Sequence, residues 1–366
     1  MPQRQMIEPS RVAPPSPRFV PRPLTDKMIA VGVASKRSPL GAIICATLIV
    51  LALADLAMFV AGMGAWSTYR AAFVPAPVAQ GHALQITTGT ATPLPTQPPQ
   101  VTLPRPPALE ARAAILLNLG TGQILYGKQL FTKLPMASTT KIMTAVVALT
   151  HGQLDQRITV GADAVAIQGT GASVAGLRQG DVLTLRDLLY ALLLPSGDDA
   201  AVVIADGIGG SQAQFVALMN QEAATLGLTE THYANAHGLD APGHYTTVRD
   251  LAILARYAMT LPVFPDVVRT ALYQLPATSD HQAYTWTTTD RMLTDLPYAG
   301  ITGIKTGFTG NAGACLVFSA TRAQGQLLGV VLGEPDETAR FTEAAKLLDW
   351  GFAVEKLTAQ PANILW

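Results

Sequence analysis

The chain has 366 residues, of which 49% are hydrophobic and 14% are charged. The charged fraction is well below the ~25% of an average soluble protein, so part of the apolar sequence is predicted to lie in a lipid bilayer, and a long disordered chain is excluded. The 25 basic and 25 acidic residues cancel, which removes any overall electrostatic argument for nucleic-acid binding.

Charge nevertheless divides the chain into regions. Residues 1–40 contain seven basic and two acidic residues and are rich in proline, so we expect a disordered cytoplasmic tail. Residues 41–66 carry one charge, Asp55, and at ~1.5 Å per residue this run is long enough to cross a ~30 Å hydrocarbon core as a transmembrane helix. Because the basic residues precede the span, the positive-inside rule places the N-terminus in the cytoplasm and the rest of the chain outside the cell membrane.

A cleaved signal peptide is the alternative interpretation of this run. Its basic region would be about 40 residues long, far longer than usual, so an uncleaved anchor is favoured.

Residues 67–108 are rich in Pro, Thr, Gln and Ala with almost no charge, which predicts an extended linker. Residues 109–366 contain 16 basic and 22 acidic residues and form the predicted folded domain.

Strand patterns occur at both ends of this domain. Residues 113–119 and 124–126 are apolar runs joined by a glycine-containing turn, as are 313–322 and 326–333, and each pair predicts a β-hairpin. A final helix is expected over 337–352, and the middle of the domain has helical periodicity over 139–150, 185–194, 200–208 and 211–226. Strands around a helical middle predict an α+β domain, with an antiparallel sheet, flanking helices and a helical lobe.

Ser138 and Lys141 form the first candidate constellation. They lie three residues apart at the start of a predicted helix and therefore share a face, so the lysine can approach the hydroxyl. Backbone N–H groups at a helix N-terminus also favour developing negative charge. The pair suits a nucleophile activated by a lysine base, although a serine N-cap followed by a solvated lysine is the commoner meaning of such a spacing.

Two further constellations follow along the chain. Ser196 and Asp198 place a hydroxyl and a carboxylate between two apolar helices, where an ordinary helix stop and N-cap is the simpler explanation. Lys305 and Thr306, on an exposed strand, would offer an ammonium group and a hydroxyl to a carboxylate, while Gly307 would let a substrate backbone approach and pair as an added strand. Each motif is weak alone, but the three in this order are much more specific.

Together the three motifs resemble the SxxK, SxN and KTG boxes of the serine D-alanyl-D-alanine carboxypeptidases, which are low-molecular-mass penicillin-binding proteins related to the β-lactamases. The stretches 235–240, 242–247 and 347–352 agree with this family, and the resemblance covers roughly 111–353. It implies a β-lactamase/DD-peptidase-like fold and a hydrolase that removes the terminal D-alanine from peptidoglycan stem pentapeptides and binds β-lactam antibiotics. No cofactor is expected, and none of the six histidines pairs with Cys, His or a carboxylate at a ligand spacing, so no metal site is expected.

The resemblance also implies a role for each motif residue. Ser138 would be the acylated nucleophile, Lys141 its general base, and Ser196 the proton relay to the departing D-alanine. Lys305 and Thr306 would hold the terminal carboxylate of the substrate, and Lys305 would help to keep Lys141 neutral by like-charge repulsion.

Further roles are implied around these boxes. The backbone N–H groups of Ser138 and Phe308 would form the oxyanion hole, which needs donors placed for the tetrahedral intermediate. Arg249 would be either a helix salt-bridge partner or a second cation near the substrate carboxylate. His237 would be a structural hydrogen-bonding residue rather than a catalyst.

Two departures from the family pattern stand out. The second box has Asp198 where the family usually has Asn; an ionised aspartate only accepts hydrogen bonds, and beside Lys141 it would raise the lysine pKa and weaken the base. We expect an active enzyme with an altered pH dependence. The alternatives are that Asp198 is protonated, that it is turned toward Lys305, or that a water replaces it in function.

The second departure is at the end of the sequence. The chain after Phe352 is short, so the additional β-domain and amphipathic anchor of some family members are expected to be absent, with the N-terminal span as the tether.

Other functions are open on the same three boxes. A DD-endopeptidase shares the mechanism and is poorly separated by sequence. A β-lactamase of class A is disfavoured, because the only glutamates between the second and third boxes, Glu222 and Glu230, match no motif of that class. The alternative from a different class, motivated by Asp198, is a catalytically silent module that binds cell-wall peptides.

Overall fold

The computed structural model describes residues 103–358. The predicted tail, the predicted transmembrane helix at 41–66 and most of the predicted linker lie outside the described residues. Within 103–358 no single helix is long and apolar enough to span a membrane; two consecutive helices, Asp198–Gly209 and Gln212–Thr225, reach that length and composition only jointly, across a bend of 85°.

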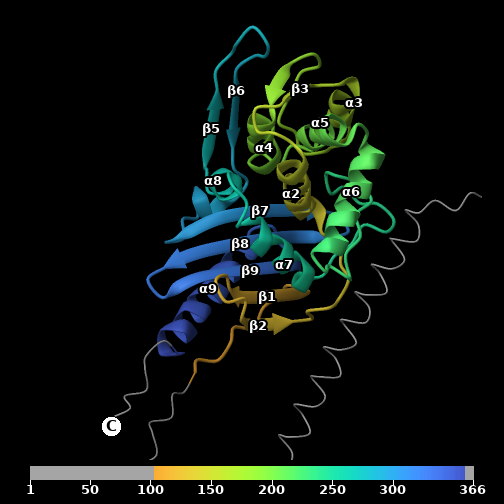
Figure 1. Cartoon of the computed structure of the whole chain (residues 1–366). Helices are drawn as coiled ribbons and strands as arrows, with labels where there is room; N and C mark the ends of the chain where they lie inside the picture. Colours follow the sequence, from red (N-terminus) through yellow and green to blue (C-terminus); the bar gives the residue numbers. More distant parts are fainter. Residues whose placement is uncertain (1–102, 359–366) are drawn as a thin grey trace, which may run out of the picture. The chain divides into compact units, whose positions relative to one another are not determined.

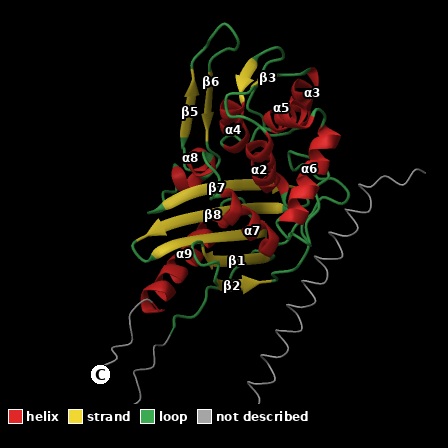
Figure 2. Ribbon diagram, viewed as in Figure 1, coloured by secondary structure: helices red, strands yellow, loops and turns green. Residues whose placement is uncertain are grey.

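A five-stranded antiparallel sheet with the strand order β2-β1-β9-β8-β7 forms one layer of the domain (Figures 1 and 2). The strands are β1 (Ala113–Asn118), β2 (Ile124–Lys128), β7 (Ile301–Thr309), β8 (Gly313–Arg322) and β9 (Gly325–Glu334). Both predicted hairpins are confirmed as β1–β2 and β8–β9, and the pairing of β1 with β9 joins the two ends of the domain into one sheet. Strand β7 lies at the edge of this sheet.

The inner strands are buried on both faces, which explains their uninterrupted apolar sequences. One face packs against α9 (Ala339–Thr358), where Leu116 and Leu348 share a hydrophobic core. The opposite face, which includes Ile115 and Val330, shares its core with the helical lobe. The predicted final helix is thus confirmed, and it covers one side of the sheet (Figure 1).

The helical lobe contains the four helices predicted for the middle of the domain. Its helices are α2 (Lys141–His151), α3 (Ala162–Ala166), α4 (Leu185–Leu193), α5 (Asp198–Gly209) and α6 (Gln212–Thr225), and it also carries the short strands β3 (Arg157–Thr159) and β4 (Val182–Thr184). Side-chain caps fix two of the helix starts, because Thr184 accepts the Asp187 N–H and Ser211 accepts the Gln214 N–H. Two helices follow the lobe in the chain, α7 (Val248–Ala258) and α8 (Phe264–Val268).

A further hairpin, which the sequence does not predict, stands beside α4 (Figure 1). It consists of β5 (Leu272–Leu275) and β6 (Tyr284–Thr287), and aromatic stacking holds it: the ring centroids of Tyr190 and Tyr273 are 3.8 Å apart, and those of Tyr273 and Trp286 are 6.0 Å apart. Short 3-10 turns complete the domain: η1 (Ala137–Thr140), η2 (Ile167–Thr170) and η3 (Arg291–Leu293).

Candidate active site

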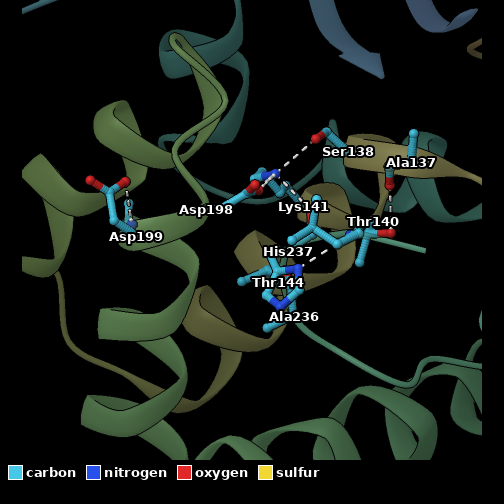
Figure 3. Close-up of polar contacts among 12 residues, drawn as sticks. Ala137, Ser138, Thr140, Lys141, Thr144, Asp198, Asp199, Ala236 and His237 are labelled. Carbon is cyan, nitrogen blue, oxygen red and sulfur yellow. Dashed lines mark hydrogen bonds and ion pairs between the residues drawn. The ribbon is translucent and has the colours of Figure 1, made fainter. Parts of the chain in front are cut away.

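Ser138 lies in η1, which runs directly into α2. Ser138 and Lys141 are therefore neighbours on one turn, and Lys141 Nζ lies 2.9 Å from Ser138 Oγ (Figure 3). Ala137, immediately before the serine, has a φ of +48°, a left-handed conformation that costs a non-glycine residue about 1–2 kcal/mol. Contacts from the surrounding structure must hold this strained turn, and with it the nucleophile, in place.

A buried histidine supports the strained turn. Thr140 Oγ1 donates a hydrogen bond to the Ala137 carbonyl at 2.7 Å, and His244 Nε2 lies 2.7 Å from the same hydroxyl. Because His244 Nδ1 accepts the Ala234 N–H at 3.0 Å, the proton of the neutral imidazole is on Nε2 and is donated to Thr140. Burial lowers the pKa of His244 to about 4, which keeps the ring neutral at physiological pH.

The ammonium group of Lys141 is completely enclosed, with 0% of its side chain exposed. It donates hydrogen bonds to Ser138 Oγ at 2.9 Å, to Asp198 Oδ1 at 2.5 Å and to the His237 carbonyl at 2.6 Å (Figure 3). Burial lowers the pKa of Lys141, because desolvation disfavours the charged form, while the Asp198 carboxylate opposes this change. Asp198 thus favours a higher pKa of Lys141, as the sequence predicts, but burial lowers this pKa by more than Asp198 raises it.

Asp198 begins α5 and is hydrogen-bonded to Lys141, not turned toward Lys305. The adjacent Asp199 points away from the lysine (Figure 3). It accepts the backbone N–H groups of residues 175–177 at 2.8 to 3.0 Å. The two neighbouring carboxylates therefore have different roles. Asp198 contacts Lys141, and Asp199 anchors the loop of residues 175–177 against the start of α5.

Ser196 lies in the turn between α4 and α5 with a φ of +65°, again in the left-handed region. The residue is 4% exposed, and its Oγ makes no hydrogen bond with any residue of 103–358. A buried hydroxyl without a partner costs ~1–3 kcal/mol. Strain and an unsatisfied polar group at one residue are typical of a functional site, which agrees with the proton relay that the family resemblance implies.

The third box lies on the edge strand β7, which packs against η1. Lys305 and Thr306 are only 1% and 5% exposed, so this part of the strand is buried, whereas the sequence-based interpretation placed it on an exposed strand. Lys305 Nζ donates to the Thr306 carbonyl at 3.1 Å, and Thr306 Oγ1 lies 2.6 Å from Thr289 Oγ1. Burial, followed by repulsion from Lys141, lowers the pKa of Lys305 well below its ordinary value.

Gly307 lets this strand approach the nucleophile. A Cβ at this position would lie 3.1 Å from both Ser138 N and Ala137 Cβ, closer than an ordinary contact. Phe308 follows on the same strand, opposite Ala314, and is 52% exposed. The two residues predicted to supply the oxyanion hole, Ser138 and Phe308, thus belong to elements in direct contact.

Arg249 has its contacts elsewhere. It lies in the first turn of α7, where its Nη1 is 3.1 Å from Asp250 Oδ1 and its guanidinium carbon is 5.9 Å from the centroid of the Phe131 ring. These contacts agree with the helix salt-bridge partner, and neither joins Arg249 to the three boxes.

Two charged residues beside the third box were missed by the sequence analysis. Arg340, on α9, is 6% exposed, and its Nη1 donates to the Gly307 carbonyl at 2.8 Å. Asp290, which caps η3, is 2% exposed and follows Thr289 in the chain. Neither residue belongs to a local sequence motif. For Arg340, the one signal in the sequence is that this arginine lies next to the apolar face of the predicted final helix.

Ser138 and Lys141, with Lys305 on the strand that packs against η1, support acyl transfer, because they combine a hydroxyl nucleophile, a desolvated amine and a cation for an anionic substrate. Across the described part of the chain, no group of three or more His, Cys, Asp or Glu side chains is placed to hold a metal ion.

Sequence comparison finds a matching family and individual relatives of this chain. The D-alanyl-D-alanine carboxypeptidase family (peptidase S11) matches residues 100–336. The D-alanyl-D-alanine carboxypeptidase DacC of Escherichia coli is 38% identical over 254 residues, 67% of this chain and 62% of that relative, so the chain spans less than two thirds of its length. The D-alanyl-D-alanine carboxypeptidase of Streptomyces sp. (strain K15) is 38% identical over 261 residues, 68% of this chain and 89% of the relative.

Solved structures agree with the sequence relatives. The crystal structure of the Streptomyces K15 DD-transpeptidase superposes with a TM-score of 0.64 at 37% identity, covering 69% of this chain and all of that one (100%). The D-alanyl-D-alanine carboxypeptidase of Mycobacterium tuberculosis gives a TM-score of 0.63 at 33% identity, covering 69% and 94%. The α+β DD-peptidase fold expected from the sequence is confirmed, and the chain belongs to the D-alanyl-D-alanine carboxypeptidase family of serine peptidases.

Proposed function

We propose that this protein is a membrane-anchored serine D-Ala-D-Ala carboxypeptidase that removes the terminal D-alanine from peptidoglycan stem pentapeptides through an acyl-enzyme on Ser138. The contact that carries this proposal is the one between Ser138 Oγ and Lys141 Nζ, 2.9 Å apart. Burial lowers the pKa of Lys141, whereas a solvated lysine at its ordinary pKa would be protonated at neutral pH and unable to accept the serine proton.

Acylation follows from this geometry. Neutral Lys141 takes the hydroxyl proton of Ser138 as Oγ attacks the carbonyl carbon of the penultimate D-alanine. The oxygen of the tetrahedral intermediate is stabilised by the backbone N–H groups of Ser138 and Phe308. Ser196 relays the proton from Lys141 to the amine of the terminal D-alanine, the carbon–nitrogen bond breaks, D-alanine leaves, and Lys141 is neutral again. Throughout, Lys305 and Thr306 bind the carboxylate of the terminal D-alanine.

Deacylation releases the shortened peptide. Water attacks the ester on Ser138 and gives its proton to Lys141, which restores the free hydroxyl and the tetrapeptide carboxylate. A β-lactam presents the same groups, a carboxylate and an amide carbonyl, so it acylates Ser138 as well. Because its leaving amine stays attached through the ring, the penicilloyl-enzyme persists.

Membrane anchoring belongs to the same proposal. The 26 residues of 41–66 form the anchor, and the basic residues of 1–40 keep the N-terminus in the cytoplasm, so the catalytic domain faces the peptidoglycan. The test is fractionation of cells that make the full chain, followed by protease treatment of spheroplasts. Recovery in the soluble fraction, or a catalytic domain protected from the protease, would contradict this topology.

The enzymatic proposal is tested with the full-length protein in detergent and a muramyl pentapeptide, with released D-alanine as the readout. Ser138→Ala removes the nucleophile and is expected to lower D-alanine release by roughly 10³-fold or more. The same pair is incubated with a fluorescent penicillin, which should label the wild-type chain covalently and leave the variant unlabelled.

Each outcome separates the alternatives. Comparable D-alanine release from Ser138→Ala would end the acyl-enzyme proposal. Absence of penicillin labelling in the wild type would support a silent peptide-binding module. Conversion of crosslinked dimers into monomers, without D-alanine release from pentapeptide monomers, would identify a DD-endopeptidase, and rapid loss of the penicillin label would identify a β-lactamase.

A second candidate, DD-transpeptidase, is favoured by one observation. The Streptomyces structure that is covered completely by this chain is named as a DD-transpeptidase. In that reaction an amine, instead of water, attacks the same acyl-enzyme, so the product carries a new amide bond. Mass spectrometry of the products in the presence of an acceptor amine distinguishes the two reactions.

A further inference from the structure

Asp290 is a buried carboxylate that the mechanism above does not use. It is 2% exposed and lies at the start of η3, where Oδ1 accepts the Met292 N–H at 3.0 Å. Its Oδ2 is buried and has no hydrogen-bond donor among residues 103–358. The preceding residue, Thr289, shares a 2.6 Å hydrogen bond with Thr306, which places Asp290 directly behind the third box.

The groups that face Asp290 from neighbouring elements are two buried cations. Lys305 of β7 and Arg340 of α9 both interact electrostatically with Asp290. Each has spare hydrogen-bonding capacity: Lys305 Nζ bonds only the Thr306 carbonyl within 103–358, and Arg340 Nε has no acceptor there. Asp290 forms no ion pair within 4 Å among residues 103–358, so it acts on these two cations through its charge and not through a direct hydrogen bond.

The charged groups around Lys305 indicate what the carboxylate of Asp290 does. Lys141 Nζ lies 2.5 Å from Asp198 Oδ1 and Arg340 Nη2 lies 3.4 Å from Glu337 Oε2, whereas Lys305 has no carboxylate within 4 Å among residues 103–358. An ionised Asp290 favours the protonated form of Lys305 against the repulsion from Lys141 and Arg340. Without it, Lys305 and Arg340 repel each other in a site that burial already makes unfavourable for cations.

We propose that Asp290 is a positioning residue that keeps Lys305 protonated, and so able to bind the terminal carboxylate of the substrate, by acting as the counter-ion of Lys305 and Arg340. This inference rests on the proposed peptidase function. Asp290 touches no reacting atom in this scheme; its effect on catalysis passes through Lys305.

The pH at which Asp290 acts follows from its burial. Desolvation raises the pKa of Asp290 to about 6, so it carries its charge above that pH and loses it below. Lys305, whose pKa is lowered by burial, needs this negative charge most at alkaline pH, where it is closest to losing its proton. The contribution of Asp290 should therefore be small below pH 6 and should grow as the pH rises.

The test is Asp290→Asn in the full-length protein, which removes the charge but keeps an oxygen to cap the Met292 N–H. With a pentapeptide substrate, we expect kcat/KM to match the wild type below pH 6 and to fall at alkaline pH, with the alkaline limb shifted down by about one pH unit or more. The loss should appear mainly in KM, because the interaction binds substrate and transition state alike.

A substrate with an amidated terminus separates positioning from general damage to the fold. It has no carboxylate for Lys305 to bind, so the variant and the wild type should hydrolyse it with the same ratio of rates at every pH. Asp187→Asn serves as a matched control, since it removes a buried carboxylate that accepts hydrogen bonds from the Thr184 and Tyr273 hydroxyls, and it should leave the alkaline limb unchanged.

The proposal is overturned if Asp290→Asn has the wild-type alkaline limb, or if it loses activity equally at all pH values and on both substrates. Failure of the proposed function is a separate result, because it would appear as an absence of D-alanine release from the wild type itself.

Discussion

The carboxylate of Asp198 contacts the same ammonium group that has to lose its proton before Ser138 can attack. It lies 2.5 Å from Lys141 Nζ and favours the charged lysine, against the larger effect of burial. Asp198→Asn keeps the shape and removes the charge, so the pKa of Lys141 should fall further. We expect the acid limb of the acylation rate to move to lower pH by about one to three units.

Stopped-flow acylation with a chromogenic β-lactam over a range of pH measures this shift. Asp199→Asn is not a suitable control, because Asp199 anchors the 175–177 loop. An exposed carboxylate such as Asp336 is suitable. An acid limb that stays in place, or that moves to higher pH, would show that Asp198 does not tune the base.

At the scale of residues, the local pairs could be predicted from sequence and the long-range partners could not. Ser138 and Lys141 meet because residues three apart on a helical turn always share a face. Asp290 and Arg340 reach the same site from η3 and α9, and only the tertiary fold brings them to β7. The burial of Lys305 could not be predicted either, since it depends on the packing of η1 against the edge strand.

At the scale of elements, the loop of residues 235–240 holds η1 in its strained conformation. Gly238 has a φ of +99°, and a Cβ there would lie 2.1 Å from the Ala137 carbonyl oxygen. Gly238→Ala should therefore displace the turn that carries Ser138, with a loss of about 3 kcal/mol or more in the free energy of unfolding and slower acylation.

Gly171→Ala is the matched control for this substitution. Gly171 also has a positive φ, +80°, but a Cβ there would meet no atom within 4 Å. It should cost only the backbone strain of about 1–2 kcal/mol and leave acylation unchanged. Denaturant unfolding and penicillin acylation of both variants give the comparison; equal losses in the two would show that the contact with Ala137 is unimportant.

The elements that the sequence predicted correctly are those with long patterns. Apolar runs cover most of β1, β8 and β9, and helical periodicity covers most of α2, α4, α5 and α6. A pattern of this length still indicates the element when single residues in it depart from the pattern. The β5–β6 hairpin was missed because each strand has four residues and a long connection, 276–283, replaces the two-residue turn that signals a hairpin. Its stability comes from rings that stack across elements, such as Tyr190 on Tyr273.

At the scale of the whole molecule, two buried carboxyl groups, Glu334 and Glu343, lie on elements that pack against each other, the last strand of the sheet and α9. Glu334 is 0% exposed, and burial, together with the nearby Glu343, raises its pKa to about 8. A carboxyl group whose pKa is raised in the folded state stabilises that state only while it is protonated. The free energy of unfolding should therefore fall as the pH rises from about 4.5 toward 8.

Glu334→Gln should remove this dependence, because the amide cannot ionise. Denaturant titrations of the wild type and the variant at several pH values measure the slopes, and we expect the stability of the variant relative to the wild type to increase with pH through this window. Parallel curves for the two proteins would show that Glu334 does not hold a proton in the folded state.

The same end of the molecule determines how the domain responds to mechanical force. Glu343 accepts the Glu110 N–H at 2.6 Å, and Trp350 Nε1 donates to the Pro104 carbonyl at 3.0 Å, so α9 clamps the chain just before it enters β1. Strand β1 has neighbours on both sides, β2 and β9. A pull along the proposed tether would therefore load this clamp first, and only after its release the two hydrogen-bonded ladders that join β1 to β2 and β9.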